Sequence, residues 1–306
     1  MKVSIVTPSY NQAQFLEETI ESVLAQDYPE IEYVIVDSST DGSLEIARRY
    51  EDRLHALVAQ EDAGQVAAIN SGFERTSGDL MAYVNSDDTL LPGAVSEMVA
   101  ELAADPALVM VYGDALYTDA DSKRTGYLTS REWDPPAMVR NCDNHVVQPS
   151  SMWTRAAWEH AGPFDERGYY FFDFELYLRM SALGPVKRVP RPWSTYREHA
   201  ASKSAGDQTG KARDYLRFAD EFLTGDRLPV ELRSYAREGR ARARVAAANN
   251  LYGQLELGPA RRWLWEALVI DPRSASRLSL SLAAKSLLPR SVVRRLRERR
   301  RAAHRG

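Results

Sequence analysis

The chain has little cysteine and no long apolar run. Its 306 residues include one cysteine, Cys142, which excludes a disulfide within the chain and is typical of a reducing compartment. No segment approaches the roughly 18 apolar residues of a membrane-spanning helix. The amino terminus has one lysine and an apolar stretch too short for a signal peptide. We therefore expect a cytoplasmic protein, with any membrane contact peripheral and at the inner face.

The net charge is small but unevenly distributed. The chain has 39 Lys and Arg against 43 Asp and Glu, a net charge of −4. Residues 283–306 hold nine of the basic residues and one Glu, so this tail carries +8 and leaves −12 for the rest. With the Leu-rich residues 278–288, the tail would suit an anionic membrane surface, and a solvated terminus is the alternative. We expect no nucleic-acid partner.

Strand-like and helical patterns alternate along the first part of the chain. The strand-like segments are 3–6, 31–36, 55–58, 80–84 and 108–112. This alternation predicts βαβ units and an α/β fold with a mostly parallel sheet and flanking helices. From about residue 207 the pattern is helical and rich in Ala and Arg. We expect a first domain over residues 1–206, with halves 1–115 and 116–206, and a helical region over 207–306.

Polar or acidic turns follow three of these strands, after Val6, Val36 and Val84. The carboxyl ends of parallel strands share one edge of a sheet, where open α/β sheets bind their ligands. The most informative turn holds two adjacent carboxylates, Asp87 and Asp88. Oxygen ligands of this kind suit Mg²⁺ or Mn²⁺, and those ions suit phosphates. A pair of Asp residues after a strand also fits ordinary turn chemistry.

An ordered set of segments resembles family 2 glycosyltransferases of the GT-A fold. The segments are VSIVTPSYNQAQFLEETIESVLAQ, VIVDSSTDGS, EDAGQVAAINSGFERTSGDLMAYVNSDD, VVQPSSMWTR, GPFDE, DFELYLR and STYREHAASKS. They cover roughly the first two-thirds of the chain in the family's order, which makes the set far more specific than any one motif. The family transfers a sugar from a nucleotide sugar, mostly with inversion. The helical last third lies outside this pattern.

The resemblance implies that residues after the first two strands contact the base of the donor. Thr7, Pro8 and Tyr10 match the turn that meets the base. Asp37 ends the second strand, and its carboxylate can accept the imide N–H of uracil or thymine, which favours a UDP- or dTDP-sugar. The family often has a second acid where this chain has Ser38, so the base stays open. A plain β-turn or an Asx-turn is the alternative at these positions.

The family's metal site matches the turn at residues 85–88. Asn85 stands at its first position, Asp87 is expected toward the ribose and the metal, and Asp88 on the metal. A divalent cation, Mg²⁺ or Mn²⁺, neutralises the charge that the nucleoside diphosphate gains as it leaves. Asp62, Asn70 and Gly72 match positions near the ribose and the diphosphate. For Asn70, an amide on the surface of a helix is the alternative.

A later segment resembles one that closes over the diphosphate in this family. Arg197 and Lys203 are natural phosphate partners, with a solvated loop as the alternative for Lys203. His199 would complete the metal shell or donate to a phosphate oxygen. On the acceptor side, the resemblance implies Gln148, Ser150 and Trp153.

An inverting transfer needs a carboxylate that takes the proton of the acceptor hydroxyl as the new bond forms. The resemblance implies Asp173, in a segment where the family usually has Glu-Asp and this chain has Phe172-Asp173. An Asp of ordinary pKa is ionised at neutral pH and ready to accept a proton. A helix cap or a salt bridge with Arg179 is the alternative role. Glu175 is the second candidate for the base.

Together these features predict a metal-dependent, inverting, hexosyltransferase-like enzyme. We expect it to act in surface polysaccharide or glycolipid synthesis, on a saccharide or lipid-linked saccharide acceptor. Two other classes remain open. A sugar-1-phosphate nucleotidyltransferase would need a Gly-rich loop with Arg after the first strand, which residues 8–11 do not supply. A non-catalytic sugar- or nucleotide-binding module would not need four separate acids, namely Asp37, Asp87, Asp88 and Asp173.

Overall fold

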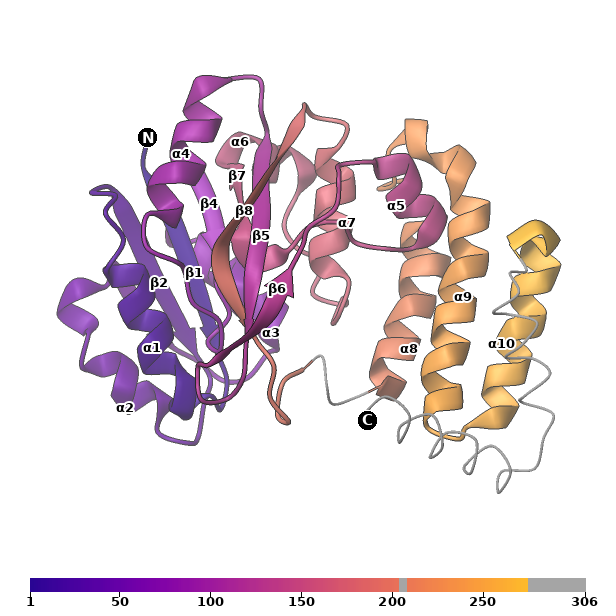
Figure 1. The fold of residues 1–306 in the computed structure, drawn as a ribbon, viewed down its shortest axis with the longest axis horizontal. Coiled ribbons are helices and arrows are strands. Elements are labelled where there is room, and N and C mark those ends of the chain that lie inside the picture. Colours follow the sequence, from indigo (N-terminus) through magenta and orange to yellow (C-terminus); the bar gives the residue numbers. More distant parts are fainter. Residues whose placement is uncertain (204–207, 275–306) are drawn as a thin grey trace. The chain divides into compact units, whose positions relative to one another are not determined.

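The computed structural model describes residues 1–203 and 208–274 (Figure 1). They form two compact units, one made of residues 1–133 and 145–202, the other of residues 134–144 and the described residues from 203 onward. The Leu-rich stretch 278–288 and the basic tail lie outside the described residues. In the ranges described, no helix has the length and apolar character that crossing a membrane requires.

Within the described residues, eight strands form one sheet in the order β3-β2-β1-β4-β7-β5-β6, with β8 paired to β5. The strands are β1 (Val3–Ser9), β2 (Ile31–Asp37), β3 (Ala56–Ala59), β4 (Leu80–Tyr83), β5 (Met110–Thr118), β6 (Arg124–Leu128), β7 (Ser151–Thr154) and β8 (Val186–Arg197). The pairs β1–β2, β1–β4, β2–β3 and β5–β8 are parallel, whereas β7 and β6 run antiparallel to their neighbours. The predicted α/β fold with a mostly parallel sheet is therefore confirmed.

The strands predicted from the sequence are present, but β5 is longer than expected. It continues past Tyr112 to Thr118 and includes the buried Asp114. Oδ1 of Asp114 accepts hydrogen bonds from the backbone N–H and the hydroxyl of Ser130, at 2.8 and 2.6 Å. A buried carboxylate whose hydrogen bonds are made by such partners can lie within a strand. Because Asp114 interrupts the run of apolar residues, the sequence pattern predicted a strand that ends at residue 112.

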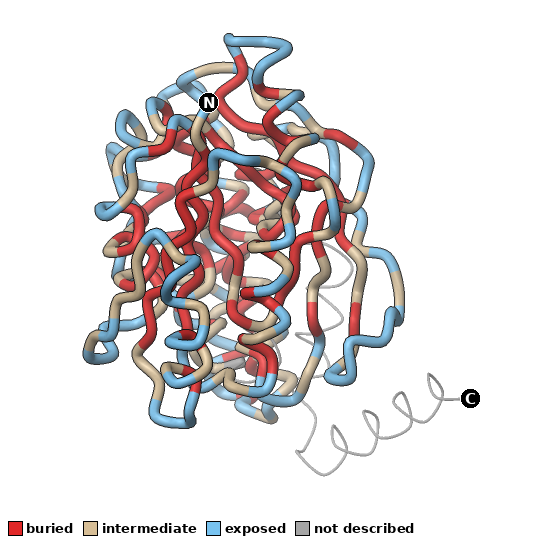
Figure 2. Tube along the Cα trace, turned by 90° about the vertical axis from the view of Figure 1, so that its left-hand side faces the viewer, coloured by how far each residue is buried: buried red, intermediate tan, exposed pale blue. Residues whose placement is uncertain are grey.

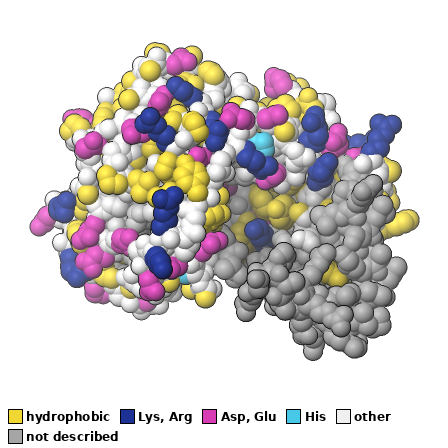
Figure 3. All heavy atoms as spheres, viewed as in Figure 1, with side chains coloured by type: hydrophobic (Ala, Val, Ile, Leu, Met, Phe, Trp, Pro, Cys, Tyr) yellow, Lys and Arg dark blue, Asp and Glu magenta, His cyan; other side chains and the backbone are white. Residues whose placement is uncertain are grey.

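Helices cover both faces of the sheet, because successive residues of a strand point to opposite sides. On β1, Ile5 belongs to the core with α1 (Ala13–Leu24), α2 (Ser43–Arg48) and α4 (Ala94–Ala104). Val6 belongs to the core with α3 (Gln65–Phe73), α6 (Arg155–Ala161) and α7 (Phe172–Met180). Figure 2 shows the strands as a buried centre between partly exposed helices. On the face in Figure 3, side chains of both charge signs are interspersed over the surface of the first unit.

Gly72 allows α3 to approach β1 closely. A Cβ atom at this position would lie 2.5 Å from Cγ1 of Val6, which is closer than real side-chain contacts. The sequence resemblance placed Gly72 near the donor, but its role in the structure is packing between helix and sheet.

The second unit consists of helices. They are α5 (Pro135–Asn141), α8 (Gln208–Arg217), the π-helix η3 (Phe218–Phe222), the 3-10 helix η4 (Val230–Tyr235), α9 (Ala236–Gly253) and α10 (Leu257–Ile270). The described residues also include the 3-10 turns η1 (Glu51–Arg53), η2 (Gln148–Ser150) and η5 (Pro272–Ser274). In this unit the Arg244 guanidinium pairs with both oxygens of Asp220, at 2.7 and 2.9 Å. Residues 134–144 pack here rather than with the first unit, and the domain boundary near residue 206 stays a prediction.

Candidate functional site

The polar turns predicted to form the site lie at one edge of the sheet. The parallel strands β1, β2 and β4 end at Ser9, Asp37 and Tyr83. Because β4 and β5 are both antiparallel to β7, β5 and its parallel neighbour β8 run in the same direction as β4. The carboxyl end of β8, at Arg197, therefore reaches the same edge as the turn after β4.

Asp87 and His199 lie next to each other at this edge. Oδ2 of Asp87 is 3.1 Å from Nε2 of His199. The imidazole ring packs on Phe15 of α1, with the ring centroids 4.6 Å apart. The side chain of Asp87 is 19% exposed, so its carboxylate has surface to offer a ligand.

Asp88 points into the protein instead. It is 2% exposed, and its Oδ1 accepts the backbone N–H of Arg197 at 2.9 Å. Its Oδ2 accepts the side-chain amide of Asn85 at 3.3 Å, and its carbonyl accepts the Thr19 hydroxyl at 2.7 Å. Burial, and then the negative charge of Asp87, raise the pKa of Asp88 well above its usual range. Asp88 therefore anchors the turn that carries Asp87.

Arg197, predicted to contact phosphate, is used within the protein. Its side chain is 1% exposed, and its Nε donates to the carbonyl of Asp87 at 2.8 Å. The guanidinium carbon lies 4.7 Å from the ring centroid of Phe15. The other guanidinium N–H groups donate to the Glu18 carboxylate, the Asp119 carbonyl and the Ser122 hydroxyl. A contact between Arg197 and the donor diphosphate stays a prediction.

The predicted metal ligands include one close pair, Asp87 and His199. In the ranges 1–203 and 208–274, no three His, Cys, Asp or Glu side chains gather closely enough to hold a metal ion. The carboxylate of Asp88 is turned inward and the side chain of His199 is 4% exposed, so their contacts with a metal stay predictions. Asp87 and His199 fit a half-site. Ligands about 2.1 Å from an octahedral Mg²⁺ or Mn²⁺ are about 3 Å apart on adjacent positions, and substrate phosphates and water commonly fill the rest.

Asp37 joins the loops after β1 and β2. Its Oδ1 accepts the backbone N–H of Ser39 at 3.0 Å and its Oδ2 accepts the Ser39 hydroxyl at 2.9 Å. The Ser39 hydroxyl oxygen in turn accepts the backbone N–H of Asn11 at 2.8 Å. Asp37 therefore forms the Asx-turn that the sequence left as an alternative. Each carboxylate oxygen still has a lone pair for a further donor.

The three residues predicted in the first turn differ in exposure. Thr7 and Pro8 are buried within β1, and Oγ1 of Thr7 lies 3.0 Å from the hydroxyl of Tyr33. Tyr10 is 55% exposed at the end of the strand. Of the three, Tyr10 is the residue whose side chain is open to a nucleotide.

The remaining predicted donor contacts have partners in the protein. Asp62 is exposed ahead of α3, and its Oδ1 accepts a backbone N–H at 2.8 Å. Asn70 bridges α3 to Phe164, donating to its carbonyl at 3.0 Å and accepting its N–H at 3.2 Å. Oδ1 of Asn85 accepts the side-chain amide of Gln65 at 2.7 Å. Asn70 thus positions a loop, and its contact with the donor stays a prediction.

Asp173 and the turn at residues 85–88 lie near the same tyrosine. Asp173 is half-buried in the first turn of α7, and its Oδ1 accepts the backbone N–H of Phe174 at 2.7 Å. Burial raises the pKa of Tyr83 well above its usual range, and the negative charges of Asp173 and Asp88 raise it further. The ring of Phe172, the residue before Asp173, lies 6.1 Å from the ring of Tyr83, so the start of α7 lies beside the end of β4.

Two of the residues predicted to contact the acceptor are buried, and their contact with it stays a prediction. Ser150 and Trp153 are completely buried, the latter among other aromatic rings of the core, so neither has surface to offer an acceptor. Gln148 is half-buried, and its side-chain amide donates to the carbonyl of Tyr83 at 2.7 Å. Glu175, the second candidate for the base, is also completely buried. Asp173 is therefore the better-placed carboxylate on α7.

Some residues at this edge have no distinguishing signal in the sequence. Phe15 fits the apolar pattern of α1, and Glu18 looks like any acid on a helix surface. The fold brings both to Arg197, which is 179 positions from Glu18. Lys203 is half-buried and belongs to the second unit, so its contact with the diphosphate stays a prediction.

The chain is similar to known proteins over most of its length. The family described as Glycosyl transferase family 2 matches residues 4–224. An uncharacterized glycosyltransferase of Bacillus subtilis, YwdF, is 29% identical over 239 residues, which is 76% of this chain and 87% of the relative. Chondroitin synthase from Escherichia coli is 29% identical over 61% of this chain, but this chain spans 27% of that protein.

The fold also resembles that of a solved structure. Residues 1–349 of TarS from Staphylococcus aureus, in complex with UDP-GlcNAc, superpose with a TM-score of 0.67. The match covers 97% of this chain and 88% of TarS 1–349, at 16% sequence identity. At that identity the likeness concerns the fold, and it agrees with the GT-A fold that the sequence resemblance implied.

Proposed function

Because the chain belongs to glycosyl transferase family 2, we propose that it is an inverting glycosyltransferase that moves a sugar from a nucleoside-diphosphate sugar to an acceptor hydroxyl. The observation that supports this most is that the start of α7, which carries Asp173, lies beside the end of β4, which leads into the turn of Asp87 and Asp88. The rings of Tyr83, the last residue of β4, and Phe172, the first of α7, are 6.1 Å apart. A base and a donor-binding turn have to meet at the reacting sugar, because transfer requires the attacking hydroxyl and the anomeric carbon to be held in contact.

On the donor side, Asp87 and His199 would hold Mg²⁺ or Mn²⁺. Such a cation, when bound, neutralises the charge of the departing diphosphate. Asp88 keeps the turn in place through its bonds to Asn85 and the backbone of Arg197. These side chains would orient the diphosphate so that the bond to the sugar breaks along the line of attack.

The base of the donor would be bound at the loops after β1 and β2. Tyr10 is exposed there and offers an aromatic face. The oxygens of Asp37 accept hydrogen bonds from Ser39 and retain lone pairs for an imide N–H. An imide is present in uracil and thymine, so we propose a UDP- or dTDP-sugar as the donor.

On the acceptor side, Asp173 would take the proton of the attacking hydroxyl. It lies in the first turn of α7, where the N–H of Phe174 donates to its Oδ1 at 2.7 Å and fixes its orientation. The proton would move to a carboxylate oxygen of Asp173 as the hydroxyl oxygen bonds to the anomeric carbon. Attack from the side opposite the leaving diphosphate inverts the configuration.

We propose a saccharide or lipid-linked saccharide as the acceptor, in the synthesis of surface polysaccharide or glycolipid. A relative named chondroitin synthase supports the assignment to polysaccharide synthesis. The basic tail 283–306 would add a peripheral contact with an anionic membrane. Flotation with phosphatidylserine vesicles, comparing the full chain with one that ends at residue 282, tests this contact. Equal binding by the two would contradict it.

The reaction itself is tested by measuring nucleoside diphosphate release from UDP- and dTDP-sugars with saccharide acceptors and Mn²⁺. We expect an α-linked donor to give a β-linked product, as read by the anomeric proton coupling in NMR. Retained configuration would contradict inversion. Release of pyrophosphate from a nucleoside triphosphate and a sugar 1-phosphate would favour a nucleotidyltransferase. Binding without turnover for every donor would favour a binding module.

A further inference from the structure

The Arg197 guanidinium connects three separate segments at the edge of the sheet. It belongs to the end of β8, and it donates to the carbonyl of Asp87 in the turn after β4. It also donates to Ser122, at 2.8 Å, in the turn between β5 and β6. On α1 it donates to Oε2 of Glu18 at 2.6 Å. Arg197, a buried cation, therefore links the turn of Asp87 to α1 and to the turn between β5 and β6. Neither of these two elements carries a predicted metal ligand.

Glu18 is the group that balances this buried charge. In the described part of the chain, Glu18 is the only carboxylate that the guanidinium itself contacts, since its other partners are carbonyls and a hydroxyl. A buried cation that loses its counter-ion is strongly destabilised. Without Glu18, the guanidinium of Arg197 would keep only neutral partners among the described residues, two carbonyls and a hydroxyl.

One face of α1 contacts both Arg197 and His199. Phe15 and Glu18 are three residues apart, so they lie on one side of the helix. The Phe15 ring contacts the guanidinium of Arg197 at 4.7 Å and the imidazole of His199 at 4.6 Å. Glu18 also accepts the Ser122 hydroxyl at 2.6 Å. A shift of Arg197 would therefore displace the ring packing of His199 and the backbone of Asp87 together.

We propose that Glu18 is a positioning residue for the metal site, which holds Arg197 so that Asp87 and His199 stay 3.1 Å apart. The inference rests on the proposed metal-dependent function. It adds a residue that touches neither metal nor substrate. Groups that orient metal ligands in this way typically change metal affinity by about 10- to 100-fold when they are removed.

The test compares Glu18→Ala and Glu18→Gln with the unchanged protein. Mn²⁺ binding is measured by the free-Mn²⁺ signal in electron paramagnetic resonance, with UDP present and no acceptor. Glu18→Gln keeps an oxygen that can accept from Arg197 and Ser122 but removes the charge. We expect Glu18→Ala to weaken Mn²⁺ binding about tenfold and Glu18→Gln to weaken it less. In turnover, the Mn²⁺ concentration for half-maximal rate should rise, while the rate at saturating Mn²⁺ falls far less.

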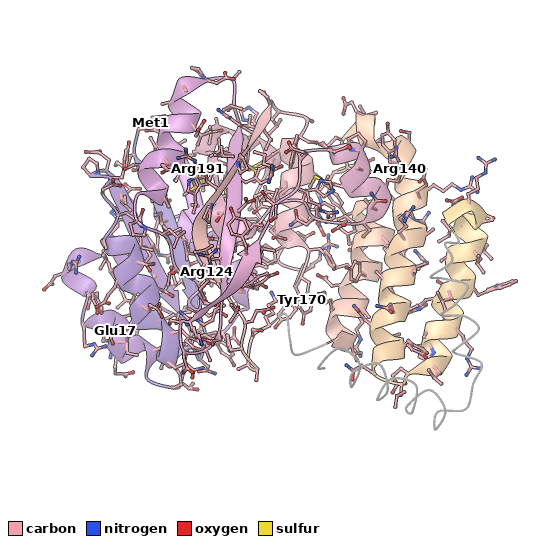
Figure 4. The ribbon with its side chains drawn as sticks, in the orientation of Figure 1. Met1, Glu17, Arg124, Arg140, Tyr170 and Arg191 are labelled. Atoms are coloured by element: carbon pink, nitrogen blue, oxygen red, sulfur yellow. The ribbon has the colours of Figure 1, made fainter. Side chains whose placement is uncertain are left out.

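Glu17→Ala is the matched control. Glu17, labelled in Figure 4, is the neighbouring residue on α1 and also forms an ion pair, with Arg49 at 2.7 Å. The two carboxylates are equally exposed, at 47% and 48%, but the side chain of Arg49 is 57% exposed, whereas that of Arg197 is buried. We expect the Mn²⁺ affinity of Glu17→Ala to stay within about twofold of the unchanged protein, because exposed pairs contribute little.

Wild-type Mn²⁺ affinity in both Glu18 variants, or an equal loss in Glu17→Ala, would overturn the inference. If Glu18→Ala does not fold, Mn²⁺ affinity is measured in Glu18→Gln and Ser122→Ala instead. Unchanged Mn²⁺ affinity in both of these variants would also overturn the inference. If the unchanged protein transfers sugar with no bound Mn²⁺, the metal assignment fails and the inference with it. If it binds Mn²⁺ and UDP but transfers no sugar, only the proposed reaction fails.

Discussion

Oδ1 of Asp88 accepts the backbone N–H of Arg197 at 2.9 Å, across 109 positions of the sequence. This bond joins the turn after β4 to the end of β8. It explains why two adjacent carboxylates behave differently, since Asp88 is held inside the protein while Asp87 remains available beside His199. Asp88 therefore fixes the turn, and Asp87 is the acid of the two with exposed surface.

Asp87→Asn should remove metal binding without unfolding the protein. We expect Mn²⁺ affinity in the presence of UDP to fall by more than about tenfold, because a charged ligand is replaced by a neutral one. The melting temperature should change little, since the Asp87 side chain is partly exposed. Asp105→Asn, at an exposed carboxylate after α4, is the control and should bind Mn²⁺ normally. Unchanged affinity in Asp87→Asn would exclude Asp87 as a ligand.

Asp173→Asn should abolish the acceptance of the proton while preserving the fold. The new side-chain oxygen can still accept the N–H of Phe174, so the first turn of α7 should remain intact. We expect kcat to fall by about 10²- to 10⁴-fold, with the KM for the donor nearly unchanged. Steady-state kinetics over a range of donor and acceptor concentrations measure both constants. Turnover at the normal rate would remove Asp173 from the role of base.

Glu32 should make the stability of the first unit depend on pH. Burial alone would raise its pKa, but hydrogen bonds from Ser77 and Lys2 lower it from 4.5 to about 2. Because the folded-state pKa is lower, this stabilisation is fully present above about pH 4.5 and is lost as the pH falls toward 2. Urea unfolding at pH 7, 5, 4 and 3 should show a steeper loss for the unchanged protein than for Glu32→Gln. Parallel curves would contradict this role.

Gly72→Ala should destabilise the packing of α3 on the sheet. The added Cβ would lie 2.5 Å from Cγ1 of Val6, and relieving that contact costs about 1–3 kcal/mol. Gly253→Ala, in α9, is the control, since a Cβ there meets no atom within 4 Å. We expect the control to gain up to about 1 kcal/mol from helix propensity. Urea unfolding measures both, and equal stability of Gly72→Ala and the unchanged protein would contradict the packing role.

The sequence predicted the fold class and the edge of the site, because strand and turn patterns are local. The ordered set of motifs also predicted roles for Asp87, His199 and Asp173, and these roles stay predictions. It could not tell which acid of the pair at 87 and 88 points inward, since that depends on a backbone N–H from β8.

The burial of other residues could not be predicted for similar reasons. Trp153 was expected on the acceptor side, but its strand β7 lies within the sheet and its ring is buried. Glu18 had no local signal at all, because its partner is brought to it only by the fold. The direction of each side chain required the three-dimensional structure.

The central claim is that Asp87 and His199 bind a divalent metal together with the diphosphate of the donor. The most direct measurement is the melting temperature with UDP, dTDP, GDP or CDP, each with and without Mn²⁺, for the unchanged protein and Asp87→Asn. Ligands that bind the folded state raise the melting temperature by mass action. We predict that UDP or dTDP stabilises the unchanged protein more with Mn²⁺ than without, and that Asp87→Asn loses this difference. No added effect of Mn²⁺ with any nucleotide, or the same effect in Asp87→Asn, would contradict the claim.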